Sequence, residues 1–183
     1  IKYASENTKK ELLPKLVTGE VIGTYGIAED SHQATEENIQ VNISADKLNG
    51  IKIAVPDAEM ASHMIVVAKS SQGIELRLAD LQDSSITVTP QKNIDTSKSF
   101  YKVEFNNTPS TLIGQSGEGW NYIQHLLDQA AVLFAFEQVG GSQAALDMAK
   151  AYSLERFAFG RQIGSYQAIK HKLADMYIAI TLA

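Results

Sequence analysis

The chain has 183 residues, 44% of them apolar, which is enough to bury a sizeable core in one large domain or two small ones. Its formal net charge of −5 offers no basic face to neutralise phosphates, so we expect no nucleic-acid partner. It contains no cysteine, which excludes disulfides, thiolate metal sites and cysteine nucleophiles.

The chain opens with a short predicted helix in a first segment, residues 1–19. Ser5 or Asn7 is its candidate N-cap, and Gly19 is its candidate stop. The pattern then changes to short β-branched or alternating runs, such as NIQVNIS, GIKIAVP and SITVTP, separated by turn residues about every ten residues. This texture predicts an antiparallel β-sandwich or barrel over residues 20–113.

Two helical patterns follow in residues 114–183. An apolar stripe that begins at Ile123 predicts a helix on the order of 50 Å long. Gly140-Gly141 lies within this stripe, which predicts either close approach of a neighbouring helix or a kink. A second amphipathic helix is predicted to start near Ser165. Because two such helices bury only part of each other, we expect partner helices from elsewhere in a longer chain or from another subunit.

The predicted fold class is α+β: an antiparallel β-sandwich or barrel followed by part of an α-helical bundle. The register of the strand SFYKVEF is not determined by its sequence, because Phe100, Val103 and Phe105 do not alternate cleanly. No apolar run approaches the roughly 20 residues that span a bilayer, so we expect no membrane contact and a cytoplasmic protein. The chain stops inside an amphipathic pattern, so we expect it to be a fragment or the ordered part of something longer.

The joint between the two helices carries Arg156, Phe159 and Gln167, where small polar turn residues are usual. Arg156 falls in the last turn of the first helix, and Gly160 is a candidate left-handed residue at its end. With Ser165 as N-cap, Gln167 lies in a first turn whose unpaired N–H groups favour an anion. Arginine supplies a rigid fork of donors suited to phosphate, and Phe159 could pack beside a flat ring. The joint is therefore a candidate pyrophosphate or nucleotide-phosphate site, with helix capping and core packing as the alternative.

The segment AYSLERFAFGRQIGSYQAIKHKLADM resembles the signature of the acyl-CoA dehydrogenase family, which reads roughly Y-x-x-x-R-x-x-F-G-x-x-I-x-x-x-Q-x-I-x-x-x-LA-(D/E)-M. The rest of the chain follows the family order: NTKKELLPKLVTGE is similar to KxxYLPxLxxGE, LNGIKIAVP to INGxKxWITN, and LIGQSGEGW to LGxxGxGF. The resemblance implies a flavoprotein with a helical N-terminal domain, a middle β-domain and a C-terminal four-helix bundle. This chain would hold the end of the first (1–19), the second (20–113) and two helices of the third (114–183).

The resemblance also implies FAD as cofactor and an acyl-CoA thioester as substrate. The family's Arg, Phe and Gln that match Arg156, Phe159 and Gln167 contact the FAD of a neighbouring subunit. We therefore expect a homo- or hetero-oligomer, a dimer or a tetramer. The segment TYGIAED stands where the family has xYxVTEP, which makes Tyr25 and Ile27 further candidate cofactor contacts.

The family's flavin-contacting sequence is altered elsewhere in the β-domain. Its Thr-Glu-Pro-x-x-Gly-Ser-Asp is replaced over residues 28–35, where only Glu29 is retained. The Trp-Ile-Thr that packs on the isoalloxazine ring reads Ala54-Val55-Pro56. The change removes a large aromatic surface and a hydroxyl donor, and Pro56 has no N–H.

No catalytic residue is identified in the chain. The reaction needs a carboxylate to take the α-proton while the flavin accepts a hydride. Some family members carry this Glu on the long helix in a D-x-E-R pattern, where residues 128–131 read DQAA, and others carry it beyond residue 183. Glu137 is expected to be solvated or packed. The four histidines pair with no carboxylate at metal-ligand spacing, so no metal site is predicted, and the glycine loop LIGQSGEGW is explained as well by turn geometry as by phosphate.

Three interpretations stay open. The first is an FAD-dependent acyl-CoA dehydrogenase with a divergent pocket. The second is a non-catalytic partner subunit that supplies FAD-pyrophosphate contacts to a complete paralogue, as in heteromeric acyl-CoA dehydrogenases that process bulky acyl groups such as steroid side chains. The third is a structural or interaction module without flavin. The joint residues are intact and the β-domain residues are nearly gone, which favours the second interpretation over the third.

Overall fold

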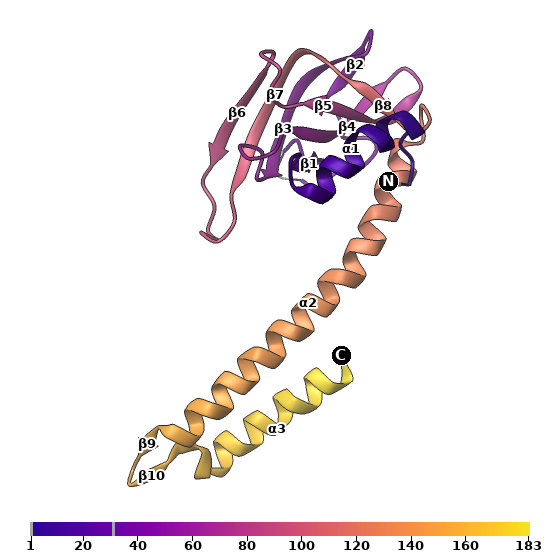
Figure 1. Ribbon diagram of the computed structural model, residues 1–183. Coiled ribbons are helices and arrows are strands. Elements are labelled where there is room, and N and C mark those ends of the chain that lie inside the picture. The colour runs from indigo at the N-terminus through magenta and orange to yellow at the C-terminus, as the bar shows by residue number, and fades with distance from the viewer. Residues whose placement is uncertain (1, 31) are drawn as a thin grey trace. The chain divides into compact units, whose positions relative to one another are not determined.

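The computed structural model describes residues 2–30 and 32–183. The chain divides into two compact units, residues 1–124 and residues 125–183, and each is considered by itself. Figure 1 shows a β-sheet with one helix in the first unit and two helices joined by a small hairpin in the second. The predicted domain boundaries at residues 19/20 and 113/114 stay predictions.

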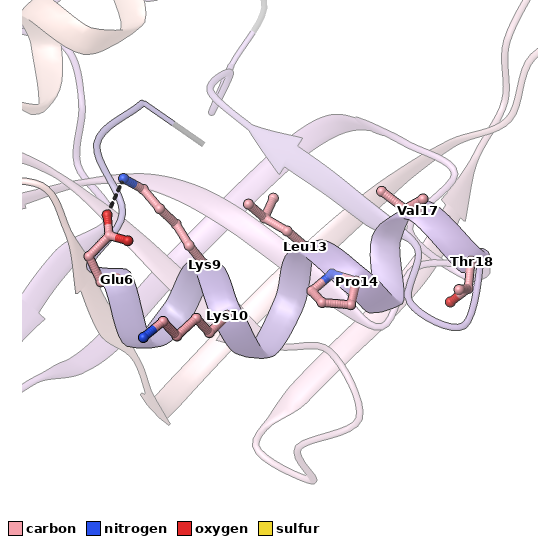
Figure 2. A pocket seen from close by; sticks show the side chains of 7 residues that line it. All are labelled: Glu6, Lys9, Lys10, Leu13, Pro14, Val17 and Thr18. Atoms are coloured by element: carbon pink, nitrogen blue, oxygen red, sulfur yellow. Dashed lines mark hydrogen bonds and ion pairs between the residues drawn. The ribbon is translucent and has the colours of Figure 1, made fainter.

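Helix α1, Glu6–Thr18, begins and ends where the sequence predicts. Of the two N-cap candidates the structure selects Ser5, whose hydroxyl oxygen accepts from the Thr8 N–H at 3.2 Å. Gly19 ends the helix with φ 76°, a conformation that favours glycine. Figure 2 shows a shallow pocket along this helix, lined only by its own side chains: Glu6, Lys9, Lys10, Leu13, Pro14, Val17 and Thr18. Because a single helix lines it, this pocket is a helix surface rather than an enclosed site.

Eight strands form the sheet of the first unit, in the order β6-β7-β3-β2-β4-β5-β8, with β1 paired to β4. Their bounds are β1 Gly23–Gly26, β2 Asn42–Ser44, β3 Lys47–Pro56, β4 His63–Ser70, β5 Gly73–Asp80, β6 Ile86–Gln91, β7 Phe100–Pro109 and β8 Thr111–Ile113. Most neighbours are antiparallel, as predicted. The pairs β1–β4 and β2–β4 are parallel, because long connections rather than hairpins join these strands.

Tyr101 shows which residues of β7 face inward. The sequence pattern of Phe100, Val103 and Phe105 does not include it. Tyr101, Val103 and Phe105 are buried and alternate along the strand, whereas Phe100 is only half-buried. Tyr101 can take an inward position because its hydroxyl donates to Glu59 Oε2 at 2.8 Å. The inward face therefore starts one residue later than the first phenylalanine suggests.

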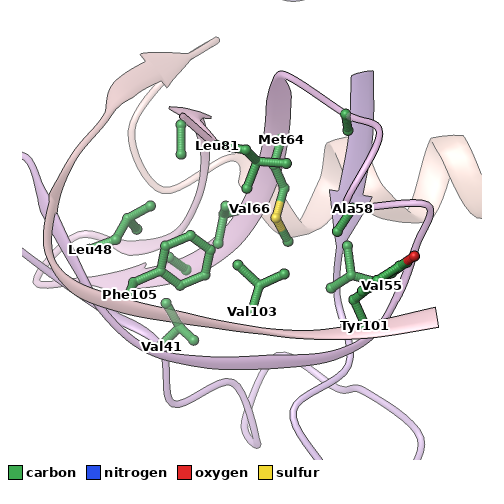
Figure 3. Packing of buried hydrophobic residues seen from close by; sticks show 13 residues of the cluster. Val41, Leu48, Val55, Ala58, Met64, Val66, Leu81, Tyr101, Val103 and Phe105 are labelled. Carbon is green, nitrogen blue, oxygen red and sulfur yellow. The ribbon is translucent and has the colours of Figure 1, made fainter. Parts of the chain in front are cut away.

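Two clusters of buried apolar side chains hold the first unit together. The larger one gathers side chains from β3, β4, β5, β7 and nearby connecting segments (Figure 3): Val41, Leu48, Val55, Ala58, Ala61, Met64, Val66, Ala68, Ala79, Leu81, Tyr101, Val103 and Phe105. The smaller one comprises Ile39, Val67, Ile74, Leu76, Ile113 and Ile123. Ile123 lies in the first turns of α2, Gly119–Glu155, so this cluster joins the start of the long helix to the sheet.

The loop before α2 packs tightly against β5. A Cβ at Gly117 would lie 2.7 Å from the Gln72 carbonyl oxygen, and one at Gly119 would lie 2.7 Å from backbone atoms of Glu75. Ser116 donates a hydrogen bond to the Glu75 carboxylate, which lies within the first unit. Close packing against the sheet therefore accounts for two glycines of this loop.

The second unit contains most of α2, a hairpin of β9 (Phe157–Ala158) and β10 (Arg161–Gln162), a 3₁₀ turn η1 (Ile163–Ser165) and helix α3 (Gln167–Leu182). The predicted N-cap Ser165 is wrong. Its hydroxyl donates to the Gln162 carbonyl oxygen at 2.7 Å, and Tyr166 is the N-cap of α3. The short turn η1 occupies the segment in which the N-cap was expected.

Helix α2 runs without interruption through Gly140 and Gly141. A Cβ at either position would meet nothing within 4 Å, so no described part of this chain makes the predicted close approach. Both helices of this unit expose large apolar side chains, among them Phe136 at 75% and Tyr177 at 59%. This exposure is consistent with the expected need for partner helices.

Across the described ranges, no helix combines the length and apolar character needed to cross a membrane. The cytoplasmic location stays a prediction.

Candidate functional site

The joint between α2 and α3 is a two-residue β-hairpin. Strands β9 and β10 pair antiparallel, with Arg161 opposite Ala158. Between them Phe159 has φ 53° and Gly160 has φ 81°, the pair of positive angles typical of a tight hairpin turn. The prediction that Gly160 ends the long helix is therefore wrong. The helix ends five residues earlier, at Glu155, and the glycine serves the reversal of the chain.

Phe159 is held in a conformation that is unfavourable for an aromatic residue. A positive φ outside glycine costs about 1–2 kcal/mol, because the Cβ approaches the backbone. The side chain is 97% exposed, so core packing within the chain does not offset this cost. Residues with backbone strain of this kind are frequent at binding sites, where the surrounding structure holds the strained conformation. The alternative of core packing is therefore wrong for Phe159 within the described residues.

Arg156 follows directly after the last residue of α2. Its N–H donates to the Tyr152 carbonyl oxygen at 2.9 Å, and its own carbonyl oxygen accepts from the Ile163 N–H at 2.8 Å. The backbone is thus tied to both flanking segments. The side chain is exposed, and its guanidinium has no hydrogen-bond or ion-pair partner among the residues that the structure describes. Its five N–H donors are available to a ligand.

Gln167 is the first residue of α3 and so lies in its first turn, as predicted. Its amide is exposed and has no partner in residues 2–30 and 32–183. The first turn of a helix carries unpaired N–H groups and a partial positive charge, which favour an anion. Arg156, Phe159 and Gln167 thus all lie at or beside one hairpin, and each presents an exposed side chain.

Tyr25 and Ile27 lie in the other unit. Tyr25 on β1 is 48% exposed, so its ring can be reached from outside. The side chain of Ile27 packs against the smaller apolar cluster, and its carbonyl oxygen accepts from Lys52 Nζ at 2.9 Å. The structure therefore gives the half-buried Ile27 side chain a packing position. The two groups of predicted residues belong to different units and are described separately.

The retained Glu29 has a structural partner. Its carboxylate accepts from Lys52 Nζ at 2.6 Å and from the N–H groups of Gln40 and Val41 at 2.6 and 3.0 Å. Burial of the Lys52 side chain lowers the pKa of its ammonium to about 8, although the Glu29 carboxylate acts in the opposite direction. Retention of Glu29 is thus explained by the fold of this loop. The sequence signal that could have found the pair is the lysine within the otherwise apolar run IKIAVP of β3.

The segment Ala54-Val55-Pro56 does not fit the ring of a flavin. Ala54 sits at a bulge of β3 with φ 50°, and its N–H donates to Gln91 Oε1 at 2.8 Å. The side chain of Val55 is fully buried. Pro56 has no N–H, and its carbonyl oxygen accepts from Thr24 Oγ1 at 2.6 Å. The Ala54 N–H and the Pro56 carbonyl oxygen are therefore already bonded within the protein.

The second unit also contains a groove between its two helices. It is lined by Ala135, Gln138, Val139, Ser142, Ala179, Ile180 and Ala183, none of which is ionisable apart from the chain end. No cluster of three or more His, Asp or Glu side chains in the described residues could hold a metal ion. Neither feature adds a catalytic group to the site at the hairpin.

The comparisons with known proteins agree on one family. The family model "Acyl-CoA dehydrogenase, C-terminal domain" matches residues 117–183. A probable acyl-CoA dehydrogenase of Bacillus subtilis, YngJ, is 30% identical over 199 aligned residues, which cover 99% of this chain and 52% of that protein. Over a shorter stretch of 60 residues, the chain is 50% identical to the acyl-CoA dehydrogenase IpdE2 of Mycolicibacterium smegmatis, covering 33% of this chain and 19% of that protein.

The fold agrees as well. The crystal structure of an acyl-CoA dehydrogenase from Geobacillus kaustophilus matches with a TM-score of 0.92 at 23% identity, covering 98% of this chain and 52% of that one. The chain spans about half the length of the curated relatives that it matches along its whole length. These relationships extend from α1 to α3. The chain belongs to the acyl-CoA dehydrogenase family.

Proposed function

We propose that this chain is part of an FAD-dependent oxidoreductase that introduces an α,β double bond into an acyl-CoA thioester. FAD-dependent dehydrogenation is the general reaction of its family. The chemistry supplied by bound FAD is the acceptance of a hydride from the β-carbon, and a carboxylate must take the α-proton. Glu137 on α2 is exposed, and no base is assigned.

The role of this chain is to bind the diphosphate of an FAD that a neighbouring subunit holds. Arg156 would donate a bidentate pair of hydrogen bonds to phosphate oxygens, and Gln167 would donate from its neutral amide. Phe159 would contribute an apolar ring surface beside the cofactor. The observation that carries this proposal is the exposure, at one hairpin, of an arginine and a glutamine without internal partners and of a strained phenylalanine.

The flavin-to-chain ratio of the native assembly tests this role. Arg156→Ala should lower the ratio strongly, because a charge-assisted bidentate contact to phosphate is lost. Lys170→Ala removes a different exposed cation, one that lies on α3, and should leave the ratio unchanged. An Arg156→Ala assembly that retains the full flavin content would contradict the proposal.

A second candidate function is favoured by the segment Ala54-Val55-Pro56. In this alternative the chain is a non-catalytic subunit of a heteromeric acyl-CoA dehydrogenase, and supplies its pyrophosphate contacts to a complete partner. Its support is that Gln91 and Thr24 already bond to the first and last residues of this segment, and that residues 128–131 carry no glutamate. Purified alone, such a chain should be colourless and should take up FAD only when it is co-expressed with its partner. Stoichiometric FAD on the chain alone would instead support a complete enzyme.

A further inference from the structure

The two arginines that flank the hairpin have different surroundings. Arg156 leaves its guanidinium without a partner among the described residues. The guanidinium carbon of Arg161 lies over the Tyr166 ring, 4.0 Å from the ring centroid. A guanidinium at this distance is attracted to the face of the ring. The two cations therefore have different roles.

Tyr166 connects the hairpin to α3 through three groups. Its hydroxyl donates to the Ala158 carbonyl oxygen on β9 at 2.9 Å. Its ring contacts the guanidinium of Arg161, a residue of β10. Its backbone is the N-cap of α3, because its carbonyl oxygen accepts from the N–H groups of Ile169 and Lys170 in the first turn, each at 3.1 Å. One residue thus links both strands of the hairpin to the first turn of the helix that carries Gln167.

The other side of the hairpin is tied to the end of α2. Ser153 is buried at 3% exposure, and its oxygen atoms lie 2.9 Å from the place where a Cβ on Gly164 would stand. The N–H of Ile163 donates to the Arg156 carbonyl oxygen at 2.8 Å. The segment after the hairpin therefore rests directly on the last turn of α2.

We propose that Tyr166 and Arg161 are positioning residues for cofactor binding, and this inference rests on the proposed function of Arg156, Phe159 and Gln167. Their contacts hold the hairpin in the conformation in which Phe159, Arg156 and Gln167 each present an exposed side chain. Arg161 acts on the hairpin through the Tyr166 ring and is not a phosphate ligand. Without these contacts, the positive φ of Phe159 would relax and the hairpin would no longer hold one conformation.

The test measures FAD affinity in the native assembly for a graded set of variants. Tyr166→Phe keeps the ring under Arg161 and removes only the hydroxyl, so binding should weaken about fivefold, as expected for one lost hydrogen bond. Tyr166→Leu removes both contacts and should weaken binding further. Arg161→Lys retains a cation over the ring and should restore most of the affinity lost in Arg161→Ala. Tyr177→Phe removes the hydroxyl of an exposed tyrosine on α3; it is the control and should have no effect.

A second measurement reports on the hairpin without the cofactor. Hydrogen exchange of the backbone amides in residues 157–162 should be faster in Tyr166→Phe than in the parent chain, because the hydroxyl contact to Ala158 is gone. Exchange in the sheet of the first unit should be unchanged. A purely structural role would alter exchange alone, whereas a positioning role alters exchange and FAD affinity together.

The outcomes separate this inference from the proposed function. If Arg156→Ala weakens FAD binding and Tyr166→Phe does not, the positioning role is overturned and the phosphate contact stands. If neither variant changes FAD binding, both fall. If Arg161→Ala weakens binding as strongly as Arg156→Ala, and Arg161→Lys restores nothing, Arg161 is itself a phosphate ligand and the inference is overturned.

Discussion

The ammonium of Lys52 lies 2.6 Å from Glu29 Oε1, and the Lys52 side chain is fully buried. This pair joins strand β3 to the loop that follows β1, and the Ile27 carbonyl oxygen completes the contact at 2.9 Å. A buried ion pair of this kind adds little net stability compared with apolar residues, but loss of one partner is costly, because the other charge is left buried. We therefore expect the free energy of unfolding to change with pH and on substitution of either partner.

The first prediction concerns stability at alkaline pH. Burial lowers the pKa of Lys52 from 10.5 to about 8, so between these values the unfolded chain binds a proton that the folded chain has lost. Because the unfolded state binds more protons, the contribution of Lys52 to the free energy of unfolding rises with pH across this window. The rise is at most about 3 kcal/mol and is absent below the lower pKa.

Urea unfolding at several pH values from about 7 to about 10 measures this contribution. Lys52→Met, combined with Glu29→Gln so that no charge is left buried, should remove the rise that Lys52 adds. Other titrating groups affect both proteins alike, so the difference between the two curves is the informative quantity. Two parallel curves would show that the pKa of Lys52 is not lowered.

The second prediction concerns Glu29. Glu29→Ala removes the partner of the Lys52 ammonium and the acceptor for the Gln40 and Val41 N–H groups. We expect the free energy of unfolding at neutral pH to fall by about 3–5 kcal/mol. Glu29→Gln keeps an acceptor oxygen and should cost less. Equal losses for the two variants would mean that the charge of Glu29 is unimportant.

The third prediction contrasts two glycines of α2. Gly119→Ala would place a Cβ 2.7 Å from the backbone of Glu75, and overpacking of this kind costs about 1–3 kcal/mol. At Gly140, where nothing lies within 4 Å, alanine should raise the stability of the isolated chain by about 0.5–1 kcal/mol, because it favours the helix. Thermal unfolding of both variants tests the contrast. If Gly140→Ala stabilises the chain but weakens its assembly, a partner helix approaches at that position.

The fourth prediction concerns the strain at Phe159. Asparagine tolerates a positive φ better than phenylalanine, so Phe159→Asn should keep or raise stability by up to about 1 kcal/mol. The same change should lower the flavin content of the assembly, because the exposed ring is lost. Phe157→Leu, at an exposed position on the adjacent strand, serves as the control. Unchanged flavin content in Phe159→Asn would show that the ring does not contact the cofactor.

Local patterns predicted much of the helical structure correctly. The cap at Ser5, the stop at Gly19 and the helical stripe after Ile123 depend on residues within a few positions of one another. The same holds for Gln167 at the start of the second helix. The joint was misread, because a Phe-Gly pair suits both a helix end and a hairpin turn. Only the pairing of β9 with β10 distinguishes them.

The amino-acid sequence by itself determined the order of elements, the α+β class and the motif that identifies the family, because periodicity and spacing are local properties of the chain. The tertiary structure alone decided the parallel pairing of β1 with β4, the burial of Lys52 against Glu29, and the contact of Tyr166 with Ala158. Each of these contacts joins groups from different elements, and the path of the backbone in space decides which groups meet. A lysine or a tyrosine looks the same in the sequence whether it meets water or a buried partner.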